Sequence, residues 1–255
     1  MMTIDQNVCI RCASCVSTCP AGIFKQTDDG SITALQQPCL DCFHCTAVCP
    51  VQAIGHHELS AEVCYPTPAS NNTLLGMLQR RHSYRHFKPE TPDRARILNA
   101  LNAASCAPSA KNQRCCEWTV VLGREKVEEL YRLGLSWAKG QHALRHLVWV
   151  DRQGRNPVTC GAPCLILAHC PADCSNPPVE GAIAAVYAEQ LLVDAGLGTC
   201  WGGYMCHIAN HCPEVNALLR LPEGHQVQAV LMVGFPDEHF RAQPYRPAAA
   251  VHWLE

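Results

Sequence analysis

The chain has 255 residues and a formal net charge of -2, and 16% of its residues are charged. This near-neutral balance argues against a nucleic-acid-binding surface or a polybasic membrane surface. The length allows one or two domains with a buried core, and no apolar stretch is long enough to span a bilayer. Because the first residues also lack the pattern of a signal peptide, we expect a cytoplasmic protein whose 19 cysteines are kept reduced.

The first fifty residues contain one cysteine run twice. The two copies are Cys9-x-x-Cys12-x-x-Cys15-x-x-x-Cys19-Pro20 and Cys39-x-x-Cys42-x-x-Cys45-x-x-x-Cys49-Pro50. This spacing resembles the run that holds two [4Fe–4S] clusters in small bacterial ferredoxins, in which the fourth cysteine of each run binds the other cluster. That rule assigns Cys9, Cys12, Cys15 and Cys49 to one cluster and Cys39, Cys42, Cys45 and Cys19 to the other.

A disulfide framework or a pair of zinc sites would account for these cysteines less well. Disulfides need an oxidising compartment, and zinc sites typically combine two short Cys-x-x-Cys pairs without a third cysteine at the same interval. We therefore expect a 2[4Fe–4S] ferredoxin-like domain over residues 1–62, organised around its clusters and pseudo-twofold because of the repeat. A linker rich in Pro, Asn and Ser is expected over 63–72, followed by a second domain over 73–255.

Helices and strands alternate in the second domain. Helices are predicted over 73–81, 124–137 and 180–195, and strands over 118–122, 163–170 and 227–234. Thr91-Pro92 predicts the cap and first turn of a further helix with Ile97, Leu98, Leu101 and Ala104 on one face. The helix over 180–195 is apolar all round and closed by Gly196, so we expect it to be buried, with a subunit interface as one candidate location. The fold class is α+β, with α/β as the alternative.

Three separated segments of this domain suggest a ligand site. Residues 80–85 (Arg-Arg-His-Ser-Tyr-Arg) suit a phosphate because guanidinium forks match its oxygens, although a solvated basic helix end is the simpler interpretation. Residues 107–113 form a polar loop, and the glycines of 196–203 permit close approach to a flat ligand. The glycine segment is not a dinucleotide fingerprint, because it follows a helix and has the wrong spacing.

Together with Val233-Gly234-Phe235-Pro236 and Tyr245-Arg246-Pro247, these segments resemble the nitroreductase family of FMN flavoproteins over residues 74–253. The whole chain thus resembles a ferredoxin–nitroreductase fusion. The resemblance implies a nitroreductase-like α+β fold, with a central sheet and surrounding helices, that forms an intertwined homodimer with two FMN sites at its interface.

The resemblance also implies residue roles. Arg81, His82, Ser83 and Arg85 match the motif that holds the FMN phosphate and ribityl chain. Pro108, Ser109, Asn112 and Gln113 match the loop along the flavin, often contributed by the partner subunit. Glu180 and Gly181 match the position near the ring edge, Gly198 and Thr199 the turn beside the ring, and Arg246 a basic residue at the phosphate. Two departures occur: Cys115-Cys116-Glu117-Trp118 replaces the common Pro-Trp after Asn-Gln, and Ala110 replaces a frequent polar residue.

These features predict an iron–sulfur flavoprotein oxidoreductase. Flavin joins one-electron to two-electron chemistry, so electrons would pass from a donor such as reduced ferredoxin or NAD(P)H, through the clusters and FMN, to a small conjugated acceptor such as a nitroaromatic or quinone. No side chain is expected to be a covalent catalyst. Trp137, Tyr204 and the His142–His146 region are candidates for selecting the substrate. The alternatives are an electron-transfer or redox-sensing flavoprotein with a protein partner, and a reductive dehalogenase-type enzyme.

Two further groups of residues have metal-ligand chemistry but weak patterns. Cys160, Cys164, Cys170 and Cys174 overlap a predicted strand, where cysteine acts as a small buried hydrophobe. Cys206, His207, His211 and Cys212 crowd four ligands into seven residues. Neither group is expected to bind a metal.

Overall fold

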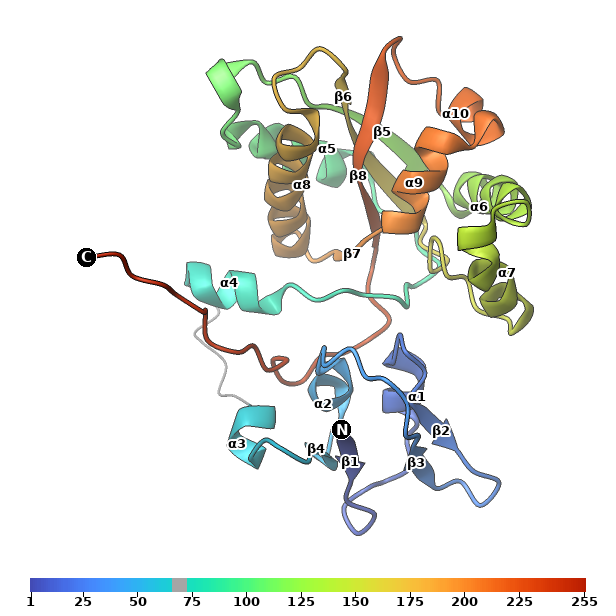
Figure 1. The fold of residues 1–255 in the computed structure, drawn as a ribbon, viewed down its shortest axis with the longest axis vertical. Coiled ribbons are helices and arrows are strands. Elements are labelled where there is room, and N and C mark those ends of the chain that lie inside the picture. The colour runs from blue at the N-terminus through green and yellow to red at the C-terminus, as the bar shows by residue number, and fades with distance from the viewer. Residues whose placement is uncertain (66–72) are drawn as a thin grey trace. The chain divides into compact units, whose positions relative to one another are not determined.

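The computed structural model describes residues 1–65 and 73–255, which form two compact units (Figure 1). The first unit comprises Met1–Arg80 and Glu238–Glu255, and the second comprises Arg81–Asp237. The predicted boundaries at 62 and 73 therefore differ from those of the units, because 74–80 and the C-terminal tail group with the N-terminal unit. Most of the predicted linker lies outside the described residues.

The first unit has an internal structural repeat. Helices α1 (Ser14–Thr18) and α2 (His44–Val48) have the same length, and each follows a residue in the left-handed region, Ala13 (φ 58°) and Phe43 (φ 56°). Two antiparallel pairs complete the repeat, β1 (Met2–Ile4) with β4 (Ile54–His56) and β2 (Phe24–Gln26) with β3 (Ile32–Ala34). Two more helices follow, α3 (Ala61–Cys64) and α4 (Leu74–Arg80). The repeated sequence is thus a repeated structure.

The second unit is built on a four-stranded antiparallel sheet. Its strand order is β5 (Glu117–Leu122), β6 (Cys164–Pro171), β8 (His225–Gly234) and β7 (Gly198–Trp201). The helices are α5 (Arg94–Ala103), α6 (Arg124–Ala138), α7 (Arg145–Arg152), α8 (Pro177–Asp194), α9 (Gly203–His211) and α10 (Pro213–Leu219). Short 3-10 helices occupy Ala104–Cys106, Ala110–Asn112 and His142–Leu144.

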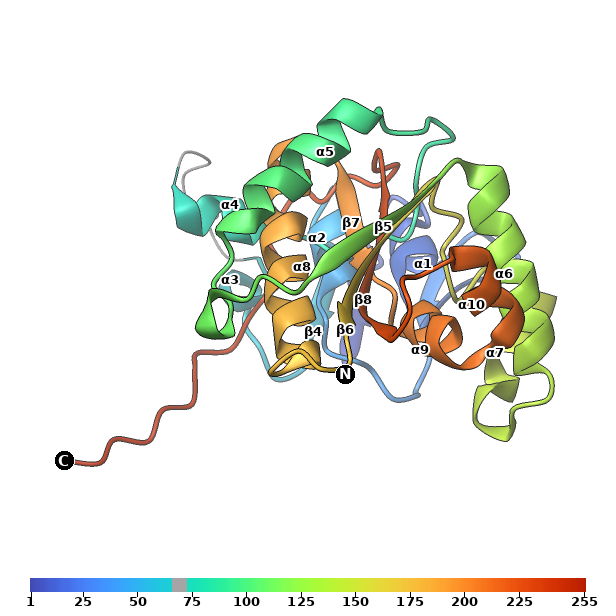
Figure 2. The same cartoon turned by 90° about the horizontal axis from the view of Figure 1, so that it is seen from above.

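Helices cover both faces of the sheet. Figure 2 shows α5 and α8 on one side and α6, α9 and α10 on the other. Along β6, Ile166 packs in a cluster with residues of α5 and α8, whereas its neighbours Leu165 and Leu167 pack in a cluster with residues of α6 and α9. Alternate residues of a strand point to opposite faces, so the continuous apolar run Cys164–Ala168 in β6 is expected for a strand covered on both sides.

The α+β prediction is confirmed, and the predicted strands and helices lie within a few residues of their observed positions. Two details are corrected. The helix predicted to start at Thr91-Pro92 is capped instead by Asp93, whose carboxylate accepts the backbone N–H of Arg96. The glycine segment over 196–203 contains strand β7, which pairs with β8. Gly196 has φ +80°, as predicted for the residue that closes α8.

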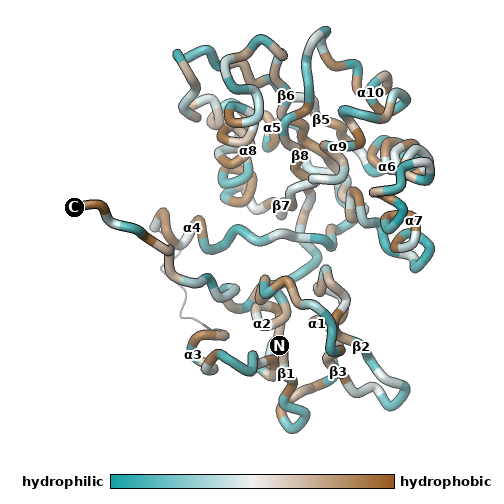
Figure 3. Tube along the Cα trace, viewed as in Figure 1, coloured by the Kyte–Doolittle hydropathy of each residue, from teal (hydrophilic) through white to brown (hydrophobic). Residues whose placement is uncertain are grey.

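Helix α8 is apolar along most of its length (Figure 3), but it is not buried all round. One face packs on β6 and β8 through small residues including Ala185 and Ala188. The opposite face leaves Val179, Val186 and Tyr187 exposed. The prediction of burial therefore holds for one face of the helix within a single chain. None of the described helices is long and apolar enough to cross a membrane.

Gly181 sets how closely α8 approaches the sheet. A Cβ at this position would lie 2.3 Å from Cβ of Gln228 on β8, far inside van der Waals contact. We expect Gly181→Ala to lower the unfolding free energy by about 1–3 kcal/mol, because overpacking outweighs the better helix propensity of alanine.

Urea denaturation of each variant, followed by tryptophan fluorescence, checks this expectation. Gly203→Ala is the matched control, because it also lies in a helix and its added Cβ would meet nothing within 4 Å. An unchanged midpoint for Gly181→Ala would contradict the packing argument.

Candidate cofactor sites

Three cysteines lie near Cys15 and form a group of four with it. Burial raises the pKa of the Cys15 thiol to about 12, and charge repulsion from Cys49, Cys12 and Cys9 adds to the effect. Thiolates that repel one another in this way are stabilised by a bound cationic cluster, which is the usual partner of such a set. These residues are the same four that the crossed ferredoxin rule assigns to one cluster.

The second group lines a cavity in the same unit. Cys19, Cys39, Cys42 and Cys45 all face it, together with apolar neighbours such as Phe43. Burial raises the pKa of the Cys45 thiol, and the nearby sulfurs of Cys42, Cys19 and Cys39 raise it further. The membership again matches the predicted ligand set.

Backbone N–H groups point at sulfur in both groups. The N–H of Ile23 donates to Cys19 Sγ at 3.4 Å, and the N–H of Ala53 donates to Cys49 Sγ at 3.2 Å, at equivalent positions of the repeat. Such hydrogen bonds stabilise thiolate ligands and tune the potential of an iron–sulfur cluster. The donor chemistry therefore fits two [4Fe–4S] clusters.

The C-terminal tail packs against the second cysteine turn. The backbone N–H of Arg241 donates to the carbonyl of Ala47 at 2.7 Å, and the Tyr245 ring meets Phe43 edge-on, with centroids 5.3 Å apart. Arg246 donates to the carbonyl oxygen of Cys42 at 3.3 Å. The residue expected at the FMN phosphate is thus placed in the first unit, beside a cysteine of the second group.

In the second unit, the 81–85 segment runs alongside β7. The backbone N–H of Tyr84 donates to the carbonyl of Thr199 at 2.9 Å, and Ser83 forms a bridge with the same residue. Gly198 is required here, because a Cβ would lie 2.9 Å from the Tyr84 ring. The structure therefore brings together Arg81, His82, Ser83, Arg85, Gly198 and Thr199, which we call half-site A.

Glu189, which no motif in the sequence had indicated, organises half-site A. Its carboxylate is buried on α8 and accepts hydrogen bonds from Thr199 Oγ1 (3.0 Å) and Trp201 Nε1 (3.1 Å). The Arg81 guanidinium also donates to it, at 3.4 Å. A carboxylate in the middle of a largely apolar helix was the available signal, because such a group must find partners when buried.

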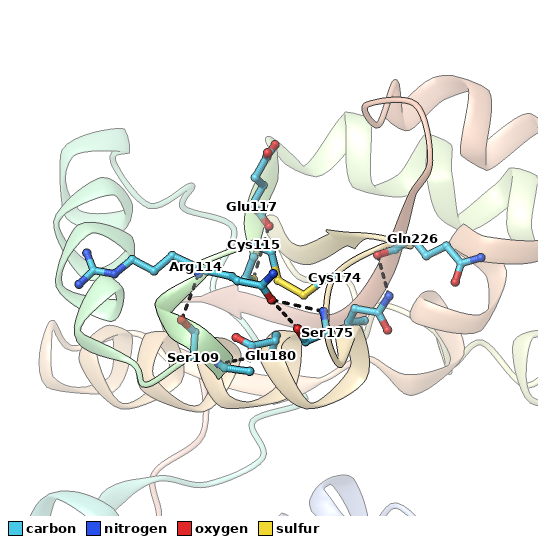
Figure 4. Close-up of a disulfide and its surroundings, with 12 residues drawn as sticks. Ser109, Arg114, Cys115, Glu117, Cys174, Ser175, Glu180 and Gln226 are labelled. Carbon is cyan, nitrogen blue, oxygen red and sulfur yellow. Dashed lines mark hydrogen bonds between the residues drawn. A yellow bond between two sulfur atoms is a disulfide. The ribbon is translucent and has the colours of Figure 1, made fainter.

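The loop over 108–113 lies at the other end of α8. The backbone N–H of Ala110 donates to Glu180 Oε1 at 2.6 Å, and Gln113 Oε1 accepts from the Ser175 hydroxyl at 2.7 Å. A disulfide between Cys115 and Cys174 also ties the chain just after this loop to the segment just before α8 (Figure 4). Half-site B comprises Pro108, Ser109, Asn112, Gln113, Glu180 and Gly181.

The two half-sites are separated within one chain. Glu180 of half-site B and Glu189 beside half-site A lie nine residues apart on α8, which corresponds to about 13–14 Å along a helix. The residues expected to hold FMN therefore form two groups at different positions along α8.

The residues suggested for substrate selection come together only in part. His146 Nε2 lies 2.9 Å from the Tyr204 hydroxyl, and their rings are 5.4 Å apart. Trp137 contacts His207 instead, with ring centroids 6.0 Å apart.

In the described residues, neither of the two weaker groups, the four cysteines over 160–174 and the cysteine–histidine group over 206–212, brings three of its ligand atoms close together. Cys174 is bonded to Cys115, although a reducing compartment had been expected to keep all cysteines free. Cys164 and Cys170 lie six residues apart on β6, about 20 Å along a strand. In the other group, Cys206 donates to the Val227 carbonyl and His207 stacks on His211.

Comparison with known families agrees with this organisation. The model of the nitroreductase family matches residues 78–235, which is more than half of the chain. The chain belongs to the nitroreductase family. A 4Fe-4S dicluster domain model matches residues 1–50, so the predicted combination of a ferredoxin-like and a nitroreductase domain is confirmed. No curated protein matches the sequence.

Solved structures share the fold at low sequence identity. A nitroreductase with bound FMN from Bacteroides fragilis is 22% identical with a TM-score of 0.62, covering 72% of this chain and 100% of its own. One from Desulfitobacterium hafniense, also with bound FMN, is 24% identical with a TM-score of 0.60, covering 71% and 97%. An FMN-dependent nitroreductase from Clostridium difficile is 20% identical with a TM-score of 0.59, covering 72% and 100%. The nitroreductase-like fold of the second unit is thereby confirmed.

Removing the Glu189 carboxylate should destabilise the second unit. We expect Glu189→Ala to lower the unfolding free energy by about 2–4 kcal/mol, because three donors lose a buried acceptor at once. Glu128→Ala is the control, since it breaks an exposed ion pair with Arg132 that contributes less than about 1 kcal/mol. Equal losses for the two variants in chemical denaturation would refute the role assigned to Glu189.

Proposed function

We propose that this protein is an FMN-dependent oxidoreductase that receives its electrons through two [4Fe–4S] clusters. The observation that carries the proposal is the grouping of eight cysteines into two sets of four, in a chain whose second unit belongs to the nitroreductase family. When bound, the clusters supply one-electron transfer, and FMN couples it to two-electron reduction.

The FMN site is proposed to form between two copies of the chain. Half-site A supplies the guanidinium groups of Arg81 and Arg85 for the phosphate, and half-site B of the partner supplies the loop along the flavin. The exposed apolar face of α8 supports a homodimer, because unpartnered apolar residues on a helix favour association. On that helix, the buried Oε1 of Gln190 has no hydrogen-bond partner in the described part of the chain.

The residues of this chain would bind and orient, and none would act covalently. The Glu189 carboxylate fixes the Arg81 guanidinium, and the Ala110–Glu180 hydrogen bond holds the flavin loop in place. The paired His146 and Tyr204 are candidates for contacting a substrate. We propose a small conjugated acceptor, such as a nitroaromatic or quinone, and a donor such as reduced ferredoxin or NAD(P)H. An electron-transfer protein without a small-molecule acceptor is the alternative.

Cofactor content after anaerobic purification tests the proposal. About eight irons and one FMN per chain are expected, with cluster and flavin absorbance bleaching together during dithionite titration. Clusters without flavin would overturn the oxidoreductase assignment. Turnover of a nitroaromatic or quinone would separate the enzyme from the electron-transfer alternative.

The crossed ligand sets predict a specific pattern of iron loss. Cys9→Ser and Cys49→Ser should each remove the same cluster and leave about four irons, whereas Cys19→Ser should remove the other. Electron paramagnetic resonance of the reduced variants identifies which cluster remains. Cys106→Ser, at an exposed cysteine outside both sets, should retain about eight irons. Identical spectra for Cys49→Ser and Cys19→Ser would contradict the crossing.

A site shared between protomers predicts complementation. Arg85→Ala disables half-site A and Asn112→Ala disables half-site B, so each homodimer should lose FMN. A mixed dimer has one site with both defects and one with neither, and it should bind about one FMN per dimer. The two variants carry different affinity tags, so that the mixed dimer can be purified through both tags and its size checked by size-exclusion chromatography. Flavin absorbance of this dimer then measures the recovered FMN. No recovery in a purified mixed dimer would show that each site lies within one chain.

A further inference from the structure

Three side chains outside the cofactor sites gather at one end of the sheet. Glu117 begins β5, His169 lies near the end of β6, and His225 begins β8, and their ligand-type atoms all lie within 4.8 Å of one another. The register explains this, because Glu117 pairs with His169, and His225 pairs with Pro171 two residues further along β6. Antiparallel pairing thus delivers these residues from three adjacent strands to one place.

The two imidazoles face each other through ring nitrogens. His169 is buried, with Nδ1 2.9 Å from Nδ1 of His225 and Nε2 3.0 Å from Oγ1 of Thr119. When the Thr119 hydroxyl accepts from Nε2, Nδ1 of His169 presents a lone pair toward His225. The two rings must then share one proton, and a cation can take its place.

Glu117 adds a negative charge beside the two histidines, on the side that is open to solvent. Its side chain is exposed, and Figure 4 shows it pointing away from Glu180 and helix α8, so it is not engaged in half-site B. A buried imidazole, a half-buried imidazole and an exposed carboxylate form a ligand set that opens to solvent on one side.

We propose that Glu117, His169 and His225 form a binding site for one divalent transition-metal ion, with zinc as the probe. Two imidazole nitrogens and one carboxylate oxygen suit zinc and leave a fourth position for water. Thr119 is a positioning residue, because a hydrogen bond to the second ring nitrogen fixes the tautomer and orientation of a ligating histidine.

The two histidine nitrogens need only a small adjustment to bind one ion, and the exposed Glu117 side chain can move toward them. Zinc–nitrogen bonds of about 2.0–2.1 Å at a tetrahedral angle hold two nitrogens about 3.3 Å apart, so the rings must separate by about 0.4 Å. His225 is only partly buried and supplies this movement by rotating its side chain. The site is independent of the proposed flavin chemistry, because none of its residues belongs to half-site A, half-site B or the cysteine groups.

Zinc binding to the protein with its clusters and flavin loaded tests the proposal. Equilibrium dialysis against buffered zinc, with metal analysis, should show one more tightly bound zinc per chain in the wild type than in His225→Gln. Glu117→Gln and Thr119→Val should each weaken binding by at least about tenfold. His211→Gln, at an exposed histidine on α9, is the matched control and should bind as the wild type does.

Zinc-edge X-ray absorption identifies the ligands. Nitrogen and oxygen at about 2.0–2.1 Å are expected for the zinc lost in His225→Gln, whereas sulfur at about 2.3 Å would assign it to free thiols and overturn the proposal. Equal zinc binding by the wild type and His225→Gln would also overturn it, leaving a simple hydrogen bond between the histidines. Unchanged iron and flavin contents show that the variants are folded.

Discussion

The close packing of α8 on the sheet is the constraint on which the second unit depends. Gly181 and a row of alanines let the helix backbone approach β6 and β8, and both half-sites are attached to this helix. Near its start, Glu180 holds the 108–113 loop through the Ala110 N–H, and near its end Glu189 holds Arg81 and Thr199. Because one rigid helix carries both, the distance between the half-sites is fixed, and so is the geometry in which a second protomer could complete them.

The sequence predicted best where local pattern and chemistry coincide. The apolar strand over 163–170 and the repeated cysteine runs both appear where expected, because burial on two faces and metal ligation each leave a local signature. The FMN contacts that the motif resemblance assigns to these residues stay predictions. The division of the residues between the two ends of α8 could not be foreseen from the sequence, because it depends on how distant segments pack.

Other differences have similar causes. Strand β7 is only four residues long and lies in a glycine-rich segment, so its pairing with β8 decides its conformation rather than its own propensity. Asp93 displaced Thr91 as helix cap because either side chain could accept the first N–H groups, and only geometry selects between them. The pairing of Cys115 with Cys174 joins residues 59 positions apart and carries no local signal.

The grouping of the C-terminal tail with the first unit changes how the two domains are joined. The chain enters the second unit at Arg81 and returns to the first after Asp237, so two chain segments connect the two compact units. A fragment that kept only residues 1–80 would lack the C-terminal segment that contacts Ala47 and Phe43. Transfer of the ferredoxin-like unit to another protein would therefore require residues 1–80 and 238–255 together.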